Sequence, residues 1–446
     1  MATHKNPTNG KPGKAVVLDG SQAQDRTGEQ VRSALLSELQ SQGWEVEELP
    51  LRTKKIGNCA GDFFCWVRSP GVCNIDDDNR EIAKSIANSD LMVYLTPITF
   101  GGYSSVLKRA VDHQIQNISP FFARVNGETH HQKRYRKYPD FLAIGWTDGN
   151  NKPEEATFRH LAWRNSLNFY AGSVVTGVVV SGQSDGEMRN AVKCWLEDIR
   201  GGTKPQGAPL PEYSPNASGE SKVRSALLLV GSPRTRVSTS NSLGTYLFER
   251  LGAQGIQTKT IYLHTVLRSP EKMRMLREAV DTSDLVVLAF PLYVDTLPAP
   301  VIEALERIAA HRNSRTSRQL FAAISNCGFP EAEHNATGLA NCANFAHQAG
   351  FAWAGSLALG AGQGMVHGTP LNELDGRVMP LKQALDLAAE ALTHGHAIPE
   401  AAQGLLAKPF IPAWLYQQLG WMGWKQQAKR YGAGRALKRR PYVEVK

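Results

Sequence analysis

The sequence predicts an α/β protein with two parallel sheets, each covered by helices on both faces, and three observations carry this prediction. The chain repeats itself: residues 14–21 (KAVVLDGS) correspond to residues 225–232 (SALLLVGS), and matching elements follow in the same order. The repeated strands are mostly continuous apolar runs that alternate with helical patterns, which is typical of a parallel sheet buried on both faces. Between the copies, Gly201 to Lys222 is rich in Pro, Gly and Ser and predicts an extended linker.

Each copy predicts five strands with helices between them. After the first strand come helical patterns at 30–42 and 242–254, and then alternating strands at 43–51 and 255–263. The third strand of each copy is an apolar run that ends in a proline, Pro97 or Pro291, and amphipathic helices follow at 106–113 and 300–310. The copies are completed by fourth strands at 140–146 and 319–326, helices at 157–170 and 337–350, and fifth strands at 172–180 and 352–360. We therefore expect domains at 14–200 and 223–400, a linker at 201–222 and an extension at 401–446.

Composition and charge narrow the class of protein. The chain has 446 residues, 42% of them apolar, so disorder is excluded as its main state. The segment from Met1 to Lys14 is polar, and no run approaches about 18 apolar residues, so we expect a cytoplasmic protein without a membrane span. The net charge of +9 lies largely at the C-terminus, in Lys425, Lys429, Arg430, Arg435, Lys438, Arg439, Arg440 and Lys446 against Glu444 alone. A solvated basic face explains this run, and nucleic-acid binding is not inferred.

The extension has a helix-compatible, Trp-rich and basic stretch at 405–440. Its aromatic residues are Trp414, Tyr416, Trp421 and Trp424. We expect these side chains to pack across the second domain; the alternative is a membrane or partner surface.

The loop after the first strand of the second copy predicts an anion site. Gly231 to Asn241 (GSPRTRVSTSN) offers a tight turn, several hydroxyls, two guanidinium groups and the unpaired N–H groups of a helix start, which suit a phosphate monoester. The loop matches neither GxGxxG nor GxxxxGK[ST], so a dinucleotide site of that kind and a triphosphatase are disfavoured. The alternative is a capped helix with a polar entry loop.

Two further loops of the second copy could hold a flat conjugated ring. The third strand ends in PLYVDTLP, and the fourth ends in NCGFPE. In an open parallel sheet these loops and the anion loop meet past the carboxyl ends of the strands. Phosphate at one loop and a planar ring at the other two is the layout of a flavin mononucleotide site.

At these motifs the second half resembles the flavodoxin-like NAD(P)H-dependent flavin reductases and oxidoreductases, over most of 225–398. The resemblance rests on GSPRTRVSTSNSL, FPLYVDTLPAPVIEALERI and SNCGFPE. It implies the strand order 2-1-3-4-5 in each sheet, and FMN with NAD(P)H as co-substrate. It also implies phosphate contacts from Ser232, Arg234, Ser238, Thr239 and Ser240, and ring contacts from Pro291, Leu292, Tyr293, Val294, Asn326, Cys327 and Gly328.

The first half resembles the iron–sulfur-flavoprotein-like branch of the same superfamily, through CAGDFFCWVRSPGVCNIDD (59–77) and TPITFGGYSSVLKRAVDH. The resemblance places Pro97, Thr99, Phe100, Gly101, Gly102 and Tyr103 in the flavin-ring loop. The first loop departs from the phosphate pattern, because Asp25 and Glu29 accompany a single arginine, Arg26, and would repel a dianion. Whether this half binds a second FMN is therefore left open.

Three cysteines, Cys59, Cys65 and Cys73, lie in one short segment. A four-iron cluster in that branch uses a CxxCxxC run and a later Cys, but the middle position here is Asp62. Three thiolates and a carboxylate could bind iron or zinc. The flanking Phe63, Phe64 and Trp66 favour a packed structural loop, and we predict no metal. Cys194 and Cys342 fit helix cores, and Cys327 is expected to pack beside the ring rather than to react.

A long insertion between the third and fourth strands of the first half carries His130 and His131, near Arg134, Tyr135, Arg136 and Asp148. Loops at this place can cover a substrate. A metal or acid–base role is possible in chemical terms, but a hydrogen-bonded surface loop is the simpler interpretation. HExxH and GxSxG do not occur, so metalloprotease and hydrolase functions have no support.

These observations predict an NAD(P)H-dependent flavin oxidoreductase that passes electrons through bound FMN to a flavin, a quinone or another small acceptor. Flavin chemistry asks little of side chains, so no catalytic residue is named. The alternative is a non-catalytic FMN electron carrier or docking module with one vestigial site, which the basic charge disfavours because small flavodoxin carriers are typically acidic. A third possibility is a tailoring oxidoreductase whose substrate lies between the domains. Family members often form dimers, so we expect either a homo-oligomer or pairing of the two repeats within one chain.

Overall fold

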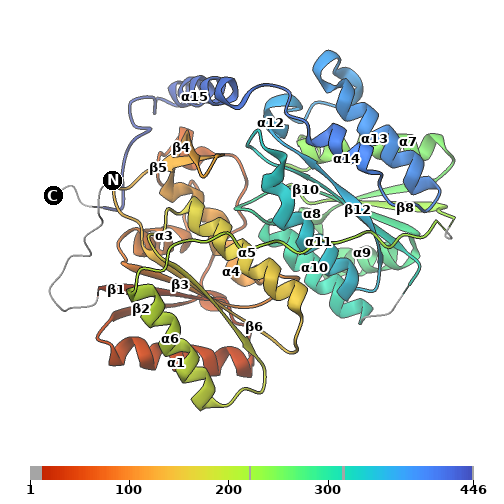
Figure 1. The fold of residues 1–446 in the computed structure, drawn as a ribbon. Coiled ribbons are helices and arrows are strands. Elements are labelled where there is room, and N and C mark those ends of the chain that lie inside the picture. The colour runs from red at the N-terminus through yellow and green to blue at the C-terminus, as the bar shows by residue number, and fades with distance from the viewer. Residues whose placement is uncertain (1–12, 220–221, 314–316, 444–446) are drawn as a thin grey trace.

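The computed structural model describes residues 13–219, 222–313 and 317–443. The polar segment before Gly13, two linker residues (Glu220 and Ser221), and Glu444 and Lys446 of the basic tail lie outside the described residues. Two five-stranded parallel sheets form the framework of the chain (Figure 1). Among the described residues, no helix is long and apolar enough to cross a membrane.

The first sheet has the order β2-β1-β3-β6-β7, which confirms the predicted order 2-1-3-4-5 once an inserted hairpin is set aside. Its strands are β1 (Lys14–Asp19), β2 (Glu45–Pro50), β3 (Leu91–Pro97), β6 (Asp140–Thr147) and β7 (Val174–Val180). Alternate residues of β1 enter different cores: Ala15 and Val17 pack with one set of helices, and Val16 and Leu18 with the other. Because every second side chain points to the same face, a continuously apolar strand must be covered on both sides.

Helices cover both faces of this sheet. The face of Ala15 packs against α1 (Arg26–Ser41) and α6 (Asp185–Arg200), and the face of Val16 packs against α3 (Asn79–Ala87), α4 (Ser105–Asp112) and α5 (Lys152–Asn168). The short helix α2 (Phe64–Val67) lies in the cysteine segment.

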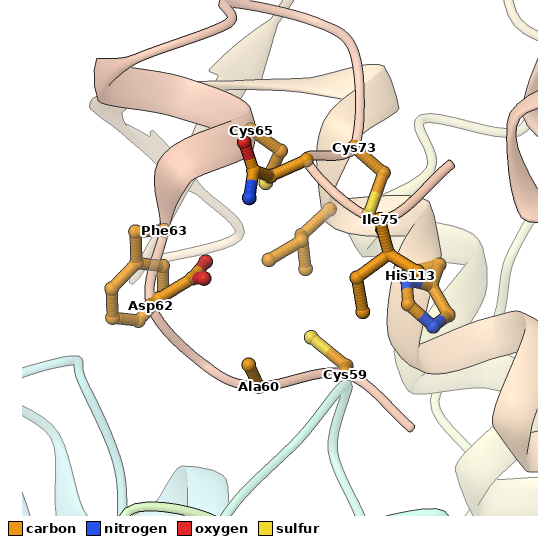
Figure 2. A pocket seen from close by; sticks show the side chains of 10 residues that line it. Cys59, Ala60, Asp62, Phe63, Cys65, Cys73, Ile75 and His113 are labelled. Carbon is orange, nitrogen blue, oxygen red and sulfur yellow. Dashed lines mark hydrogen bonds between the residues drawn. The ribbon is translucent and has the colours of Figure 1, made fainter. Parts of the chain in front are cut away.

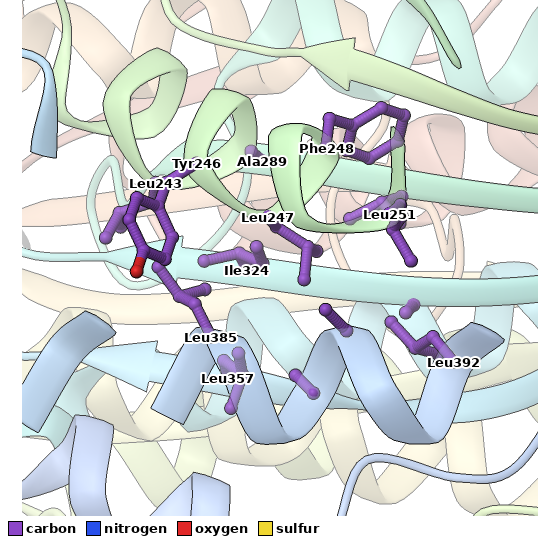
Figure 3. Packing of buried hydrophobic residues seen from close by; sticks show 14 of the residues in the cluster. Leu243, Tyr246, Leu247, Phe248, Leu251, Ala289, Ile324, Leu357, Leu385 and Leu392 are labelled. Carbon is purple, nitrogen blue, oxygen red and sulfur yellow. The ribbon is translucent and has the colours of Figure 1, made fainter. Parts of the chain in front are cut away.

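The second sheet has the order β12-β11-β10-β8-β9, the same topology as the first. Its strands are β8 (Ser225–Val230), β9 (Gln257–Tyr262), β10 (Leu285–Pro291), β11 (Leu320–Asn326) and β12 (Ala352–Leu359). One face packs against α7 (Thr239–Ala253) and α13 (Met379–Thr393), and Leu247 of α7 and Leu385 of α13 belong to one buried cluster (Figure 3). The other face packs against α9 (Pro270–Thr282), α10 (Ala299–Arg312) and α11 (Ala336–Gln348). The short helices α8 (Leu263–Val266) and α12 (Gly362–Met365) lie in connections.

The two halves pack through corresponding helices, α4 against α10 and α5 against α11. Arg109 and Glu303 hold the same position in α4 and α10, four residues after Ser105 and Ala299, and they form an ion pair at 2.9 Å. In a symmetric homodimer this position would face a copy of itself. Duplication within one chain instead lets an arginine face a glutamate.

The described residues of the linker form no helix or strand, and they pack along both halves. Tyr213 lies 2.7 Å from Thr157 Oγ1 of α5 through its hydroxyl, and Asn216 exchanges hydrogen bonds with the backbone of Trp353 in β12. The linker is therefore bound to both halves along its length.

The insertion of the first half forms an antiparallel hairpin, β4 (Ile118–Val125) and β5 (Glu128–Lys133). The expectation of a surface loop is wrong for its core: His130, Arg134 and Tyr135 are buried. These three side chains are buried because the hairpin lies between the first half, the second half and the tail.

The extension forms α14 (Glu400–Ala407) and α15 (Ala413–Arg430). Helix α14 packs on the second half, against α13 and β12. The expectation that the tail aromatics pack across the second domain is wrong for Trp424, because most of α15 lies on β4 and α2 of the first half (Figure 1), but Tyr416 of the same helix does reach the second half. Trp424 packs against Phe63 and Trp66, with ring centroids 5.3 Å apart in each pair, so the first half supplies the apolar partners.

Candidate functional site

The candidate site lies at the carboxyl ends of β8, β10 and β11, where the loop Gly231–Ser238 leads into α7. The Ser238 hydroxyl caps α7 by accepting a hydrogen bond from the backbone N–H of Asn241 at 3.2 Å. The N–H groups of Thr239 and Ser240 belong to the first turn, which has no helical acceptors for them, and the helix dipole makes this end positive. A neutral cap on a positive helix end leaves room for an anion.

The side chains predicted for the phosphate gather around this turn. Ser232 and Ser240 are buried, and Arg234 is exposed at the loop surface. Asn326, at the end of β11, donates hydrogen bonds to Ser240 Oγ at 2.9 Å and to the Phe290 carbonyl at 3.0 Å. Asn326 therefore fixes the predicted phosphate loop relative to a predicted ring loop.

In the first half, the N-terminal turn of the corresponding helix, α1, is capped by a carboxylate, that of Asp25. Asp25 caps α1 by accepting from Gly28 N at 2.9 Å, and its other oxygen accepts from the Trp146 indole N–H at 2.9 Å. Trp146 is buried at the end of β6, the place that Asn326 has at the end of β11. A negative charge at this turn would repel a phosphate dianion, so these residues do not fit FMN.

The ring loop of the second half forms a tight turn in which Tyr293 and Thr296 exchange backbone hydrogen bonds. Its central residues, Val294 and Asp295, have φ of 45° and 62°, a conformation that costs energy in residues other than glycine. The first half holds the turn in place, because Asn165 of α5 donates to the Val294 carbonyl at 3.3 Å and to Asp295 Oδ2 at 3.1 Å.

The matching loop of the first half does not present the predicted flavin contacts. The residues named for it are Pro97, Thr99, Phe100, Gly101, Gly102 and Tyr103. Phe100 and Tyr103 are 3% and 0% exposed: the Phe100 ring enters the core of the second half, and the Tyr103 hydroxyl donates to Asn165 at 3.0 Å. The Phe100 carbonyl accepts hydrogen bonds from Asn341 and Asn344 of α11. This loop is used for contact between the halves.

The cysteine segment of the first half covers the site of the second half. Arg234 donates to the Gly61 carbonyl, at 2.6 Å from Nη2, and lies over the Phe63 ring at 5.8 Å. Gly61 has a φ of +63°, and a Cβ there would come within 1.9 Å of the Tyr293 hydroxyl. Only glycine therefore allows the segment to approach this closely.

The hairpin covers the site from a second side. Arg124 forms an ion pair with Glu331 at 2.6 Å, and Thr129 donates to the same oxygen of Glu331 at 2.9 Å. Burial raises the pKa of Glu331, but the His334 imidazole, whose Nε2 lies 3.7 Å from Oε2, and the hydrogen bond from Thr129 outweigh it and lower the pKa to about 2. Burial lowers the pKa of His131 to about 3, so this imidazole is neutral and packs on the Phe329 ring.

The tail supplies a third cover, because the Tyr416 hydroxyl of α15 donates to the Gly328 carbonyl at 2.6 Å. The sequence did not indicate the contribution of Arg124, nor that of Arg164, which lies in α5 and forms an ion pair with Asp295 of the ring loop at 3.7 Å. Both come from segments far from the second half along the chain. The only sequence feature that pointed to a cover over this site was the length of the insertion between the third and fourth strands of the first half.

The three cysteines and Asp62 line one cavity of about 20 Å³, with His113 at its edge (Figure 2). Burial raises the pKa of Cys59 to about 12 and also raises the pKa values of Cys65 and Cys73. In the part of the chain that the structure describes, no group of three or more His, Cys, Asp or Glu is placed to hold a metal ion.

The remaining cysteines divide by burial. Cys327 is buried, burial raises its pKa to about 12, and its thiol donates to the Phe329 carbonyl at 3.3 Å, so it is a packed thiol rather than a thiolate. Cys342 is buried as expected. Cys194 is exposed, so its assignment to a helix core is wrong: it lies on the outer face of α6.

Comparison with known proteins gives a consistent family match. The model of a family described as NADPH-dependent FMN reductase matches residues 14–176 and again residues 225–360. An iron-sulfur flavoprotein of Archaeoglobus fulgidus is 28% identical over 102 residues, 23% of this chain and 46% of that protein. One of Methanocaldococcus jannaschii is 33% identical over 100 residues, 22% of this chain and 50% of that protein. The chain thus spans about half the length of the curated relatives it matches.

Solved structures show weaker similarity. An FMN-dependent NADH-azoreductase from Bacillus anthracis in complex with FMN has a TM-score of 0.29 and 13% identity, covering 38% of this chain and 99% of that one. An NAD(P)H:quinone oxidoreductase from Methanothermobacter marburgensis has a TM-score of 0.29 and 15% identity, covering 39% of this chain and 98% of that one.

Proposed function

Because the chain belongs to the NADPH-dependent FMN reductase family, with both halves matched, we propose that it passes electrons from NAD(P)H through one bound FMN to a flavin, quinone or other small acceptor. The FMN lies in the second half, within a domain at 223–400. The first half, at 14–200, serves as its cover and support.

The difference between two helix caps carries this proposal. Ser238 caps α7 with a neutral hydroxyl, whereas Asp25 caps α1 with a carboxylate that also binds Trp146. A phosphate dianion is attracted to the first helix end and repelled from the second. One flavin per chain follows.

The phosphate would be held by the N-terminal turn of α7 and by side chains around it: Ser232, Arg234, Ser238, Thr239 and Ser240. The ring would lie against Pro291, Leu292, Tyr293, Val294, Asn326, Cys327 and Gly328. When bound, FMN supplies a ring that accepts a hydride and passes electrons on. The chain would orient the ring through the two loops that Asn326 links by hydrogen bonds. The aromatic residues Phe63, Phe329 and Tyr416, which lie at these loops, would limit the access of water.

Exchange of the two caps tests the proposal. Aspartate is as good a helix cap as serine, so Ser238→Asp keeps α7 while placing a carboxylate at the phosphate. We expect wild type to bind about one FMN per chain, and Ser238→Asp to weaken binding at least about tenfold, as one lost charged contact does. Asp25→Ser is the matched control and keeps a single FMN. Two FMN per chain in the wild type, or full binding by Ser238→Asp, would contradict the proposal.

Turnover separates the enzyme from a non-catalytic carrier. We expect steady-state NADPH or NADH oxidation when FMN, a quinone or ferricyanide is added. Bound flavin without turnover on any of these acceptors would identify a carrier instead.

The cysteine segment is not assigned a metal. Its donors, Cys59, Cys65, Cys73 and Asp62, are of types that bind iron, and the matched relatives are named iron-sulfur flavoproteins. The cavity that they line has a volume of only about 20 Å³, however, and among the described residues no group is placed to hold a metal ion. Iron and acid-labile sulfide found in protein purified without oxygen, and lost in Cys65→Ser, would reject this assignment.

A further inference from the structure

Helix α15 carries four of the nine large apolar side chains that are exposed among the described residues. These exposed side chains are Val237, Met275, Met379, Trp414, Leu419, Trp421, Met422, Tyr431 and Val443. Four of them belong to α15: Trp414, Leu419, Trp421 and Met422 are 62%, 51%, 45% and 61% exposed. Trp414, Trp421 and Met422 are spaced by seven and eight residues, so they share one face of the helix.

The inner face of α15 fixes this orientation. Tyr416 donates to the Gly328 carbonyl, and Trp424 packs against Phe63 and Trp66. Gly420 lies so close to the hairpin that a Cβ there would be 2.4 Å from the Phe122 ring. The helix therefore cannot turn its tryptophans inward without losing these contacts.

The charged residues of the tail segment itself have one sign. From Ala401 to Val443 the sequence has no Asp or Glu, while its cations are Lys408, Lys425, Lys429, Arg430, Arg435, Lys438, Arg439 and Arg440. The last residues of α15 and the segment after it expose most of them. The Lys425 ammonium lies 3.5 Å from the centroid of the Trp421 ring, so cation and aromatic ring are adjacent on the same face.

We propose that the outer face of α15, with the basic segment after it, binds the surface of an anionic lipid bilayer. Tryptophan and other apolar side chains enter the boundary between headgroups and acyl chains, and flanking lysines and arginines contact lipid phosphates. The complementarity of the cationic segment to anionic headgroups favours a bilayer over a second copy of this chain, which would bring eight like charges to the same contact. The helix lies on the membrane, since the described helices include none that could cross it.

Vesicle flotation with the full-length protein tests the proposal. We expect the protein to float with vesicles that contain about one third phosphatidylglycerol, and not with phosphatidylcholine alone. About 0.5 M NaCl should weaken binding, because it screens the ionic part. Acyl-chain-brominated phosphatidylcholine in the anionic vesicles should quench tryptophan fluorescence, which shows that rings enter the bilayer.

Two double variants distinguish binding by the outer face of α15 from non-specific binding by any exposed apolar side chain. The double variant Trp414→Gln/Trp421→Gln should lose at least about tenfold in vesicle affinity, as expected when two interfacial aromatics are removed. The control, Met275→Gln/Met379→Gln, removes exposed apolar side chains elsewhere and should bind as wild type does. Circular dichroism and the melting temperature verify that both variants are folded.

Three outcomes would overturn the proposal. These are no flotation with anionic vesicles, flotation that the tryptophan variant does not weaken, and wild-type self-association that the tryptophan variant abolishes in the absence of vesicle binding. The last result would assign the face to a contact between copies of the chain.

Discussion

The Asp112 carboxylate of α4 accepts a hydrogen bond from the backbone N–H of Ala299 at 2.9 Å, and so caps the first turn of α10 across the contact between the halves. Glu306 of α10 returns the same interaction, because its carboxylate accepts from Ser105 N at 3.1 Å and from Ser105 Oγ at 2.7 Å. Asp112 and Glu306 occupy the same position in their helices, seven residues after Ser105 and Ala299. Each half thus supplies a carboxylate to the helix start of the other.

Asp112→Ala should destabilise the whole chain. The change leaves the buried Lys108 ammonium without its carboxylate and Ala299 N without an acceptor. Removal of one partner of a buried ion pair typically costs about 3–5 kcal/mol. Urea denaturation measures the loss. The control is Glu278→Ala in an exposed pair with Arg274, which should cost less than about 1 kcal/mol; equal effects would show that the capping pair contributes little.

The ion pair between Arg109 and Glu303, which hold equivalent positions in the two halves, should tolerate exchange of its two charges. Arg109→Glu places two carboxylates together and should cost about 1–2 kcal/mol, since both side chains are partly buried. Adding Glu303→Arg restores opposite charges and should recover most of the loss. A double-mutant cycle of unfolding free energies measures the coupling. A swap that recovers nothing would indicate that the ion pair does not align the halves.

Stability should fall as the pH rises between about 5 and 8 because of Glu154. Burial at the start of α5 raises its pKa from 4.5 to about 7, against hydrogen bonds that favour the charged form. The folded state therefore binds the proton more tightly than the unfolded state, and the difference is lost as the pH rises through the folded pKa. Glu154→Gln should flatten melting temperature against pH and stabilise the protein at pH 8 by about 1–3 kcal/mol. The exposed Glu212→Gln should leave the wild-type slope, and an unchanged slope in Glu154→Gln would reject this cause.

Arg234 should contribute more to FMN binding than its neighbour Arg236. Its guanidinium is positioned by the Gly61 carbonyl and the Phe63 ring. Arg234→Gln should weaken FMN binding about 10–100-fold, the usual loss for a charge-assisted phosphate contact. Arg236→Gln, an exposed change in the same loop, should weaken it far less. Flavin fluorescence titration measures both, and equal losses would assign the effect to net charge alone.

The fold could be predicted from the sequence because its signals are local. Alternation and apolar runs act within a few residues and the internal repeat shows two copies, so the two parallel sheets are confirmed; their strand order, also confirmed, was implied by the family resemblance. The fit of α15 could not be predicted in this way. Its aromatic residues indicate that something covers one face, but Trp424 finds its partners, Phe63 and Trp66, only after the hairpin and the cysteine segment are placed.

The candidate site, too, has features that local sequence predicts and features that only the folded structure shows. By itself the sequence determined two copies of one parallel sheet and predicted a phosphate loop after Val230, because hydrophobic periodicity and loop chemistry are properties of neighbouring residues. The tertiary structure alone decided that Asp25 is bound by Trp146, 121 positions away, and that Arg234 is held by Gly61, 173 positions away. Such contacts form only when the chain folds and brings distant segments together. Composition and local spacing therefore cannot tell which half has a helix N-terminus without a carboxylate cap.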